Sequence, residues 1–250
     1  MEGAEVFGRL NWQFGEVVTT RQETVRAKSI TLAVPDWAGH RAGQHVDLRL
    51  TSEDGYHAER SYSIASPPED GPRVTITVER IDSGEVSPYL TDELHEGDKL
   101  ELRGPIGGYF VWEGSMGGPL FLVAGGSGIV PLMAMIRHEA AARSSVATRL
   151  LYSSRSLGEI IYGDELERLA QGSKSLQVMH TLTRQVPTGW AGYRRRVDAD
   201  MLRDVAWPAD QNPLTYICGP TPFVEATATS LAGLGYVPQR IKTERFGPTG

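Results

Sequence analysis

The first part of the chain alternates hydrophobic and polar residues over short runs. The segments at residues 45–50 (HVDLRL) and 73–79 (RVTITVE) repeat with a period of two, which is typical of half-buried β-strands. Similar β-rich runs occupy residues 14–20 and 29–34, and clusters of Gly, Pro and Asp between the runs mark turns. The pattern predicts short antiparallel strands, as far as about residue 103, that form a closed or partly closed β-barrel.

One helix is expected within this part, near residues 88–94. Ser87 is of a type that caps helix N-termini, and Pro88 suits the first helical position. A Gly/Pro-rich stretch at residues 104–119 then marks a boundary in the chain.

After that boundary, strand patterns alternate with helical ones. Strands are predicted at residues 120–124, 149–152, 176–182, 214–218 and 240–246, and helices after Pro131 and at residues 163–170, 199–205 and 221–234. Asp198 is placed to cap the helix at residues 199–205. This βαβ repetition predicts a parallel sheet with helices on both faces, in which ligands bind beyond the carboxyl ends of the strands. The expected domains are residues 1–113 and residues 114–250.

Composition narrows the function classes. The chain has 250 residues, 40% of them hydrophobic, and a net charge of −6. These values describe an ordinary globular chain and argue against a nucleic-acid binder. Cys218 is the single cysteine, which excludes an internal disulfide and a four-cysteine zinc or iron–sulfur site, and no metal site is predicted. We find no apolar run long enough to span a bilayer and no secretory signal, so a cytoplasmic location without membrane insertion is expected.

The turn after the strand at residues 120–124 is the most informative stretch. It consists of Gly125, Gly126, Ser127 and Gly128, and Pro131 follows in the first turn of the expected helix. Glycines let a ligand approach the backbone closely. The free N–H groups and the dipole of the helix N-terminus favour a phosphate or pyrophosphate. An ordinary tight turn is the alternative interpretation.

A second candidate site lies on a strand of the first part. With a period of two, Arg60 and Tyr62 share one face of the strand, and Ser61 and Ser63 share the other. A guanidinium suits bidentate binding of a phosphate, and a tyrosine ring can lie against an aromatic cofactor. The alternative is an exposed strand with a surface arginine.

A third candidate site precedes the helix expected near residues 88–94. Gly84, Val86 and Ser87 lead into that helix, and backbone N–H groups there can hold a pyrophosphate. The alternative is an ordinary helix cap.

Residues that follow the second and third strands of the second part bear on the choice of nicotinamide nucleotide. A site selective for NAD places an acidic residue after the second strand to bind the ribose 2′-OH. Hydroxyls and cations stand at these strand ends instead, namely Ser153, Arg155, Thr183 and Arg184, with Arg194 nearby. Because arginines and hydroxyls bind a 2′-phosphate, the sequence favours NADPH, with NADH as the alternative. The arginines at residues 194–196 could equally form a solvated basic surface.

Five short segments together resemble a known family. They are RSYS at residues 60–63, GEVS at 84–87, GGSGIVP at 125–131, CGP at 218–220 and ERF at 244–246. Their order is that of ferredoxin–NADP reductase-type flavoproteins, and the chain is similar to the reductase modules that supply bacterial oxygenases. The resemblance implies a two-domain α/β protein, with an antiparallel Greek-key β-barrel for FAD and then a doubly wound parallel α/β domain for NADP.

The resemblance also implies roles for individual residues. Arg60 would bind the FAD pyrophosphate, Tyr62 would pack on the isoalloxazine and Ser63 would lie near flavin N5. The full set expected at FAD is Arg60, Ser61, Tyr62, Ser63, Gly84, Val86, Ser87 and Phe246. The set expected at NADPH is Gly125, Gly126, Ser127, Gly128, Pro131, Ser153, Arg155, Thr183, Arg184, Arg194, Cys218, Gly219 and Pro220. Ser63, Cys218 and Glu244 are expected to be catalytic, because they would shape the contact between nicotinamide and flavin.

The function that the resemblance implies is oxidation of NADPH through FAD. The electrons would pass to a separate acceptor, such as a ferredoxin, an oxygenase component or a small molecule. Two alternatives stay open at this point: a flavin reductase that releases reduced flavin, and a non-catalytic nucleotide-sensing module on the same scaffold.

Overall fold

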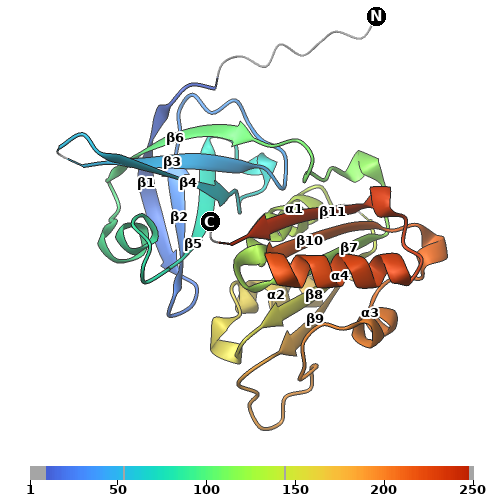
Figure 1. Ribbon diagram of the computed structural model, residues 1–250. Coiled ribbons are helices and arrows are strands. Elements are labelled where there is room, and N and C mark those ends of the chain that lie inside the picture. Colours follow the sequence, from blue (N-terminus) through green and yellow to red (C-terminus); the bar gives the residue numbers. More distant parts are fainter. Residues whose placement is uncertain (1–9, 53, 144, 248–250) are drawn as a thin grey trace, which may run out of the picture.

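The first half of the protein is an antiparallel β-barrel (Figure 1). The computed structural model describes residues 10–52, 54–143 and 145–247. The barrel strands are β1 (Gln13–Gln22), β2 (Ala27–Ala33), β3 (His45–Thr51), β4 (His57–Ser63), β5 (Arg73–Glu79) and β6 (Lys99–Ile106). Their order in the sheet is β4-β3-β6-β1-β2-β5. Within it, β6-β1-β2-β5 is a Greek key, with the β3–β4 hairpin inserted in the connection from β2 to β5. The expected Greek-key barrel is confirmed.

The two edge strands of this sheet meet and close the barrel. Ile64, just after β4, forms an antiparallel bridge with Ile76 of β5, and the backbone N–H of Ala65 donates to the carbonyl of Thr75 at 2.7 Å. Side chains with a period of two fill the interior, and Ile30, Leu48 and other members of this core are fully buried. Closure therefore fixes the end of β4, where Ser63 lies.

The helix expected near residues 88–94 is a short helical stretch that starts at residue 87 with a bond from the N–H of Leu90 to the carbonyl of Val86. Its remainder, Tyr89–Glu93, is a wide turn closed by a bond from the N–H of Leu94 to the carbonyl of Tyr89. The expected cap at Ser87 is wrong, because its hydroxyl oxygen accepts the backbone N–H of Ile81 at 3.0 Å instead. The hydroxyl thus holds the preceding loop and not the turn that follows.

The second half is a five-stranded parallel sheet covered on both faces. Its strands are β7 (Leu120–Gly125), β8 (Thr148–Ser154), β9 (Leu176–Leu182), β10 (Leu214–Pro220) and β11 (Ile241–Phe246). The helices are α1 (Ile129–Ala141), α2 (Gly163–Gly172), α3 (Ala199–Val205) and α4 (Thr221–Gly233). The helices α1 and α2 pack with one face of the sheet, and α3 and α4 pack with the other. The expected doubly wound domain is confirmed, as is the cap of α3, since Asp198 accepts the N–H of Met201 at 2.8 Å.

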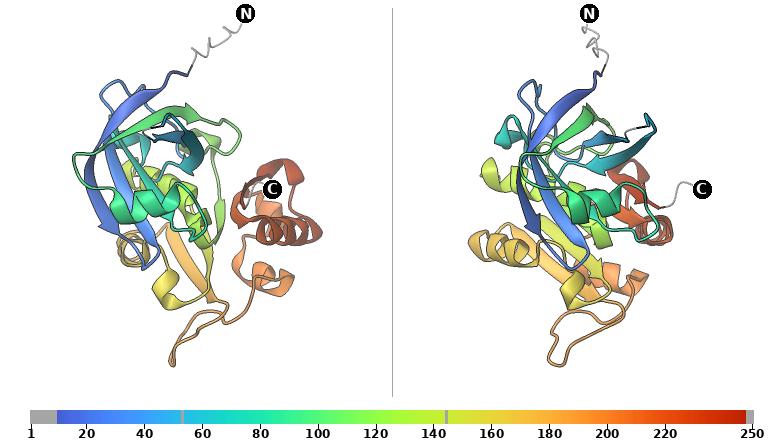
Figure 2. Two further views of the ribbon diagram at one scale, coloured as in Figure 1. Left: turned by 60° about the vertical axis from the view of Figure 1, so that its left-hand side comes forward. Right: turned by 90° about the vertical axis from the view of Figure 1, so that its left-hand side faces the viewer.

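The strand order β11-β10-β7-β8-β9 places the direction change of the fold between β7 and β10. The helix after β7 lies on one face and the helix after β10 on the other, so a crevice opens at the carboxyl ends of these two strands. The barrel faces that crevice. Figure 1 shows the two halves side by side, with the end of β11 reaching toward the barrel, and in Figure 2 the barrel is turned forward and lies in front of part of the second half.

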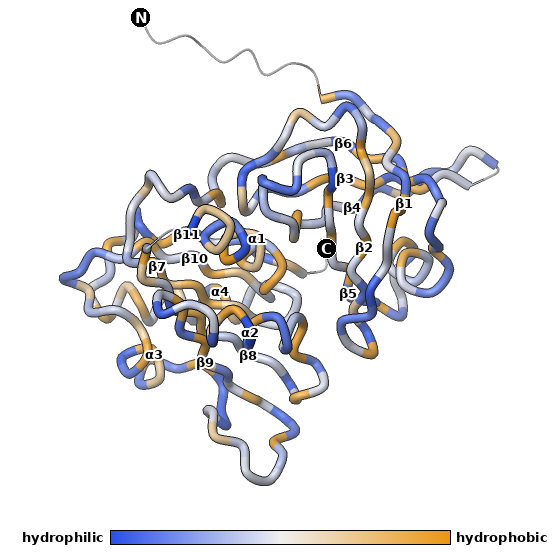
Figure 3. Tube along the Cα trace, turned by 180° about the vertical axis from the view of Figure 1, so that it is seen from behind, coloured by the Kyte–Doolittle hydropathy of each residue, from blue (hydrophilic) through white to orange (hydrophobic). Residues whose placement is uncertain are grey.

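Hydrophobic residues gather along the central strands of both halves, while the outer loops are largely hydrophilic (Figure 3). In β7, alternate residues serve two cores: Leu120 and Leu122 pack with α1, and Phe121 and Val123 pack with α4. Among the residues that the structure describes, we find no helix long and apolar enough to cross a membrane.

Candidate functional site

The glycine turn after β7 needs its glycines for two different reasons. Gly126 has a φ of +56°, in the left-handed region that favours glycine. Gly128 is required by close packing, because a Cβ there would lie 2.1 Å from the carbonyl oxygen of Cys218. A Cβ on Gly125 would lie 2.9 Å from the ring of Phe223. The turn is therefore pressed against the end of β10, and α1 begins directly after it.

Cys218 lies at the carboxyl end of β10, beside this turn. Its side chain is fully buried, and its register partner on the neighbouring strand is Glu244. Burial raises the pKa of the Cys218 thiol well above its ordinary value, and the nearby carboxylate of Glu244 raises it further. The thiol therefore stays protonated and neutral at physiological pH.

Ser63 and Glu244 join the two halves of the protein. The Ser63 hydroxyl, at the end of β4, donates to Oε1 of Glu244 on β11 at 3.2 Å. Burial raises the pKa of Glu244 to about 7, although the hydrogen bond from Ser63 opposes the shift. A carboxyl group with such a pKa exchanges its proton near neutral pH. The structure thus brings Ser63, Cys218 and Glu244 to one place.

The faces of β4 are as the sequence predicts. Ser61 donates to Oδ1 of Asp47 at 2.7 Å on the outer face, while Tyr62 packs with the barrel core on the other. Burial raises the pKa of Tyr62 to about 12, so its hydroxyl stays neutral. Arg60 is half exposed and pairs with Glu85 at 3.3 Å.

The segment before the wide turn has a defined shape. The side chain of Val86 is buried, as is that of Ser87. A Cβ on Gly84 would lie 3.0 Å from the hydroxyl oxygen of Ser87. Glu85, between them, is the residue that reaches Arg60, so this segment and β4 are neighbours.

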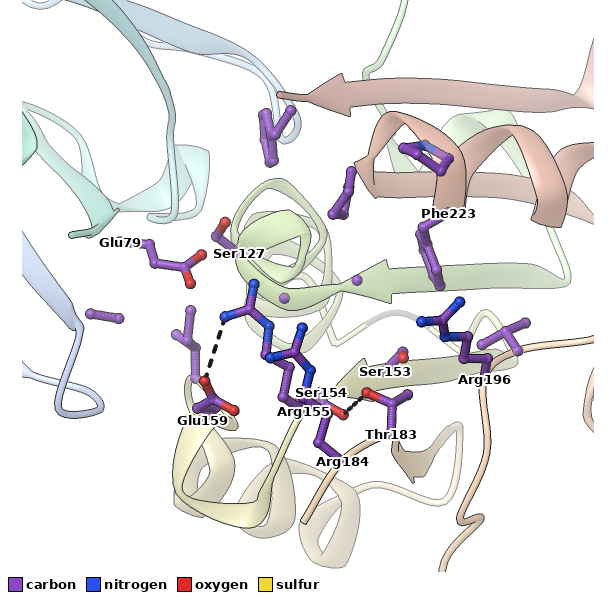
Figure 4. Close-up of a pocket in the computed structure, with 18 of the residues that line it drawn as sticks. Glu79, Ser127, Ser153, Ser154, Arg155, Glu159, Thr183, Arg184, Arg196 and Phe223 are labelled. Atoms are coloured by element: carbon purple, nitrogen blue, oxygen red, sulfur yellow. Dashed lines mark hydrogen bonds and ion pairs between the residues drawn. The ribbon is translucent and has the colours of Figure 1, made fainter. Parts of the chain in front are cut away.

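A pocket opens at the carboxyl ends of the parallel strands (Figure 4). It is lined by the expected residues Gly125, Gly126, Ser127, Ser153, Arg155, Thr183, Arg184, Pro220 and Phe246. The barrel closes one side with the β1–β2 hairpin and Glu79. Strand ends and a glycine turn of the second half thus meet the barrel around one cavity.

Four arginines line this pocket. Arg26 comes from the β1–β2 hairpin and is bonded to Asp82 at 3.2 Å, while Arg155, Arg184 and Arg196 come from the second half. Figure 4 shows Arg155 and Arg184 from neighbouring strand ends, with Arg196 across the pocket from them. Arg155 pairs with Glu159 at 3.8 Å. Arg194, which we expected here, instead donates to the carbonyl of Trp190 at 2.7 Å. The loop after β9 folds back on that strand, and as a result Arg196 lines the pocket while Arg194 bonds to Trp190.

Several other lining residues were not predicted. Phe223 of α4 lies over the glycine turn, and Ser154, Thr227, Glu79 and Glu159 also contribute to the wall. In the sequence, the feature that could have predicted Phe223 as a pocket residue is its position three residues after the CGP segment. Four further expected residues are buried and are not among those that line the pocket: Gly128, Pro131, Cys218 and Gly219.

The residues fit two dinucleotides. In the second half, the open space at Gly126, the glycine turn before α1 and three arginines suit the phosphates of a nicotinamide nucleotide. In the barrel, β4 presents a half-exposed guanidinium at Arg60 and an aromatic ring at Tyr62, which suit the pyrophosphate and ring system of a flavin nucleotide.

Comparison with family models agrees with this division. Residues 18–111 match an oxidoreductase FAD-binding domain, and residues 122–229 match an oxidoreductase NAD-binding domain. Among solved structures, the FAD/NAD-binding domain of nitric oxide dioxygenase from Vibrio cholerae superimposes with a TM-score of 0.84, at 24% identity, and covers 94% of this chain and 99% of that one. A ferredoxin NADP+ reductase from Neisseria gonorrhoeae, with FAD and NADP bound, has a TM-score of 0.80 at 21% identity, over 94% and 98% of the two chains. These structures share the fold.

Two relatives are similar in sequence to this chain over most of its length. The chain is 36% identical, over 84% of its own length, to the glycine betaine monooxygenase reductase subunit of Pseudomonas aeruginosa, but it spans only 57% of that relative. It is 35% identical to ferredoxin–NADP reductase B of Sorangium cellulosum, over 82% of this chain and 84% of the relative. The chain therefore belongs to the ferredoxin–NADP reductase-type family of FAD- and NAD(P)H-binding oxidoreductases.

Proposed function

We propose that this chain takes electrons from NADPH through FAD and delivers them to a separate acceptor protein, a ferredoxin or an oxygenase component. The observation that carries the proposal is the meeting of Ser63, Glu244 and Cys218. The hydrogen bond between Ser63 and Glu244 joins the flavin-side strand to the sheet that ends at the nicotinamide-side turn. In this proposal residues 1–113 hold FAD and residues 114–250 hold the nicotinamide nucleotide.

The roles proposed for the barrel residues follow their positions. Arg60 binds the FAD pyrophosphate, Tyr62 packs on the flavin ring, and Ser63 lies at its reactive edge. Gly84 and Ser87 shape the loop beside Arg60. Phe246 covers the flavin from the C-terminal strand, and its ring lies at the wall of the nucleotide pocket.

The preference for NADPH rests on the charges in the pocket. Arg155, Arg184 and Arg196 line it, and a 2′-phosphate is the part of NADPH that such a set recognises. Glu159, the carboxylate near the strand ends, is paired with Arg155 and so is less available to a ribose 2′-OH. We expect NADPH to exceed NADH in kcat/KM by at least about tenfold, since one lost charge-assisted contact costs about 1.5–3 kcal/mol.

When bound, FAD supplies the chemistry of accepting a hydride and releasing electrons one at a time. The protein's own residues hold the reactants and move a proton. Ser63 donates a hydrogen bond toward Glu244, whose carboxyl, with a pKa of about 7, can hold or release a proton at its Oε atoms. Cys218, as a buried neutral thiol, would keep the end of β10 beside Glu244 uncharged.

The acceptor is proposed from the chemistry of this chain and from its relatives. Cys218 is the only cysteine of the sequence, so this chain holds no four-cysteine iron–sulfur cluster. An acceptor of that kind belongs to another polypeptide or segment. Some relatives of this chain are reductase components of oxygenases, among them that of 3-ketosteroid-9-alpha-monooxygenase in Mycobacterium tuberculosis, of which it spans 65% at 30% identity. A small-molecule acceptor and a cytoplasmic location also remain predictions.

An anaerobic titration tests the proposal. The purified protein, loaded with FAD, is mixed with NADPH or NADH while the flavin absorbance is followed. We expect bleaching by NADPH with the preference given above, and loss of that preference in Arg155→Ala and Arg184→Ala. A protein that takes up no FAD, or whose flavin neither nucleotide reduces, contradicts the proposal.

One observation favours a flavin reductase as a second candidate. Arg60 is already paired with the carboxylate of Glu85, which would compete with a pyrophosphate and weaken the hold on the flavin. Gel filtration of the loaded protein separates the two functions: flavin that elutes with the protein indicates an electron-transfer reductase, and flavin that elutes freely indicates a flavin reductase.

A further inference from the structure

Arg137 occupies an unusual position between the two halves of the protein. It lies on α1, and its side chain is 18% exposed. Nε and Nη2 donate to the two carboxylate oxygens of Glu165 on α2, at 2.9 and 2.7 Å. Nη1 donates to the carbonyl of Ala65 in the barrel at 2.8 Å. The guanidinium also lies 4.8 Å from the ring centre of Tyr162.

The contact with Ala65 acts on the flavin-side strand. Ala65 follows Ser63 by two residues, and its own N–H donates to the carbonyl of Thr75. The segment after β4 is thus held on one side by β5 and on the other by the guanidinium. A movement of α1 relative to the barrel would therefore act on the segment that follows Ser63.

The same helix begins at the nucleotide turn. Ile129, its first residue, follows Gly126–Gly128, and the turn is packed against the carbonyl of Cys218. Arg137 lies eight positions after Ile129, which is about 12 Å of helix at 1.5 Å per residue. One rigid element therefore links the nicotinamide-side turn with the flavin-side strand.

Simple stabilisation does not explain this arrangement well. Replacing a buried ion pair by apolar residues is often neutral for stability, whereas leaving one partner unpaired is costly. Burial would raise the pKa of Glu165, but the hydrogen bonds and charge of Arg137, together with the charges of Arg168 and Arg21, lower it. Both side chains therefore stay charged, and the guanidinium of Arg137 binds the carboxylate of Glu165 and the carbonyl of Ala65 at the same time.

A neighbouring hydrogen bond also joins the second half to the barrel. Tyr162, whose ring lies beside the guanidinium, donates its hydroxyl to Thr77 of the barrel. Thr77 is in turn hydrogen-bonded to Ser29 at 2.8 Å, and Ser29 donates to Glu23 at 2.7 Å. These bonds anchor the start of α2, and so Glu165, to the barrel.

We propose that Arg137 is a positioning residue for hydride transfer: through Ala65 and α1 it fixes the flavin-side strand relative to the nucleotide turn. The inference deepens the proposed function and rests on it. A misplacement of about 1 Å at a reaction centre costs about 100-fold in rate. Loss of the Arg137 contact is therefore expected to slow flavin reduction by tenfold or more without a matching loss of NADPH affinity.

The test uses the FAD-loaded protein and a variant designed to fold. Arg137→Met/Glu165→Met removes both charges together, which avoids a lone buried carboxylate. The control is Arg149→Met. Arg149 also bonds backbone carbonyls, those of Val205 and Ala206, and stacks on the ring of Trp207, but these partners all lie within the second half.

Anaerobic stopped-flow mixing with NADPH gives the limiting rate of flavin reduction and the apparent Kd separately. We expect the double variant to lose at least tenfold in the limiting rate, with a Kd within about threefold of wild type, while the control keeps both. Arg137→Lys should be intermediate, since a lysine ammonium is a point charge and cannot serve Glu165 in bidentate fashion and Ala65 together. A limiting rate of the double variant within twofold of wild type overturns the proposal.

Hydrogen–deuterium exchange without nucleotide provides a readout that does not depend on NADPH. We expect faster exchange over residues 63–66 in the double variant and no change there in Arg149→Met. If NADPH fails to reduce even the wild-type protein, the proposed function fails, and this exchange decides the positioning role alone. Unchanged exchange over residues 63–66 then overturns it.

Discussion

Glu244 carries a prediction about stability and pH. Its pKa of about 7 in the folded protein lies above the ordinary value of 4.5 because burial disfavours the carboxylate. Between these two values the folded state holds a proton that the unfolded chain has lost. Stability contributed by the neutral carboxyl is therefore complete below about pH 4.5 and is lost as the pH rises through 7.

The size of this effect follows from the same two values. The difference corresponds to about 3 kcal/mol, which the wild-type protein loses progressively as the pH rises from about 4.5 to about 7. Glu244→Gln has nearly the same shape but no proton to lose, so it escapes the penalty. We expect the variant to gain on wild type as the pH rises, by about 6–12 °C in Tm at pH 8 relative to pH 5, given about 2–4 °C per kcal/mol for a chain of this size.

Thermal melts of both proteins from pH 5 to pH 8.5 check the prediction. Glu225→Gln is the control, because Glu225 is an exposed carboxylate that pairs with Arg245 on the same strand as Glu244. If the Tm difference between Glu244→Gln and wild type is equal at pH 5 and pH 8, the carboxyl does not titrate near neutrality and the reasoning is refuted.

Three further variants test other parts of the structure. Glu85→Gln frees Arg60 from its ion pair and should tighten FAD binding by about 1.4- to fivefold, because exposed pairs measure about 0.2–1 kcal/mol. Fluorescence quenching measures the affinity, and equal affinities would contradict the prediction. Asp198→Ala removes the cap of α3 and should cost about 1 kcal/mol, seen as a Tm lower by a few degrees; an unchanged Tm would show that the cap contributes nothing. Gly128→Ala places a Cβ 2.1 Å from a carbonyl oxygen and should lower the Tm far more than Gly126→Ala. A Cβ on Gly126 meets open space, and its φ of +56° costs only about 1–2 kcal/mol. Equal losses of Tm in the two variants would contradict the close packing at Gly128.

The periodicities of the sequence predicted both halves of the fold, because each half buries its residues regularly. In β5 (RVTITVE), alternate residues enter the barrel, and in β7 the whole run is buried between two helical layers. β4 (HAERSYS) is harder to predict from hydropathy, since few of its residues are buried. The sequence of β4 reflects its position at the edge of the sheet and the polar groups that it presents, and not burial in the core.

The candidate site was predictable where a residue acts locally, and less so where tertiary structure decides. The glycine turn combines strand, glycines and helix within a dozen residues, so its position could be read from the sequence. The choice of Arg196 over Arg194 in the pocket depends on a loop that folds back on β9, where Tyr193 bridges Thr181. Likewise, the position of Ser87 before an expected helix predicts a helix cap, but in the folded loop its hydroxyl oxygen accepts the N–H of Ile81 instead.

The central claim is that two dinucleotides, one in each half, meet where Ser63, Cys218 and Glu244 come together. Anaerobic reduction of the FAD-loaded protein by NADPH that carries deuterium at one face of nicotinamide C4 tests it most directly. We predict a primary isotope effect on flavin bleaching with deuterium on one face and none with deuterium on the other, because a fixed cleft presents a single face. Equal isotope effects from both faces, or a flavin that NADPH does not bleach, would contradict the claim.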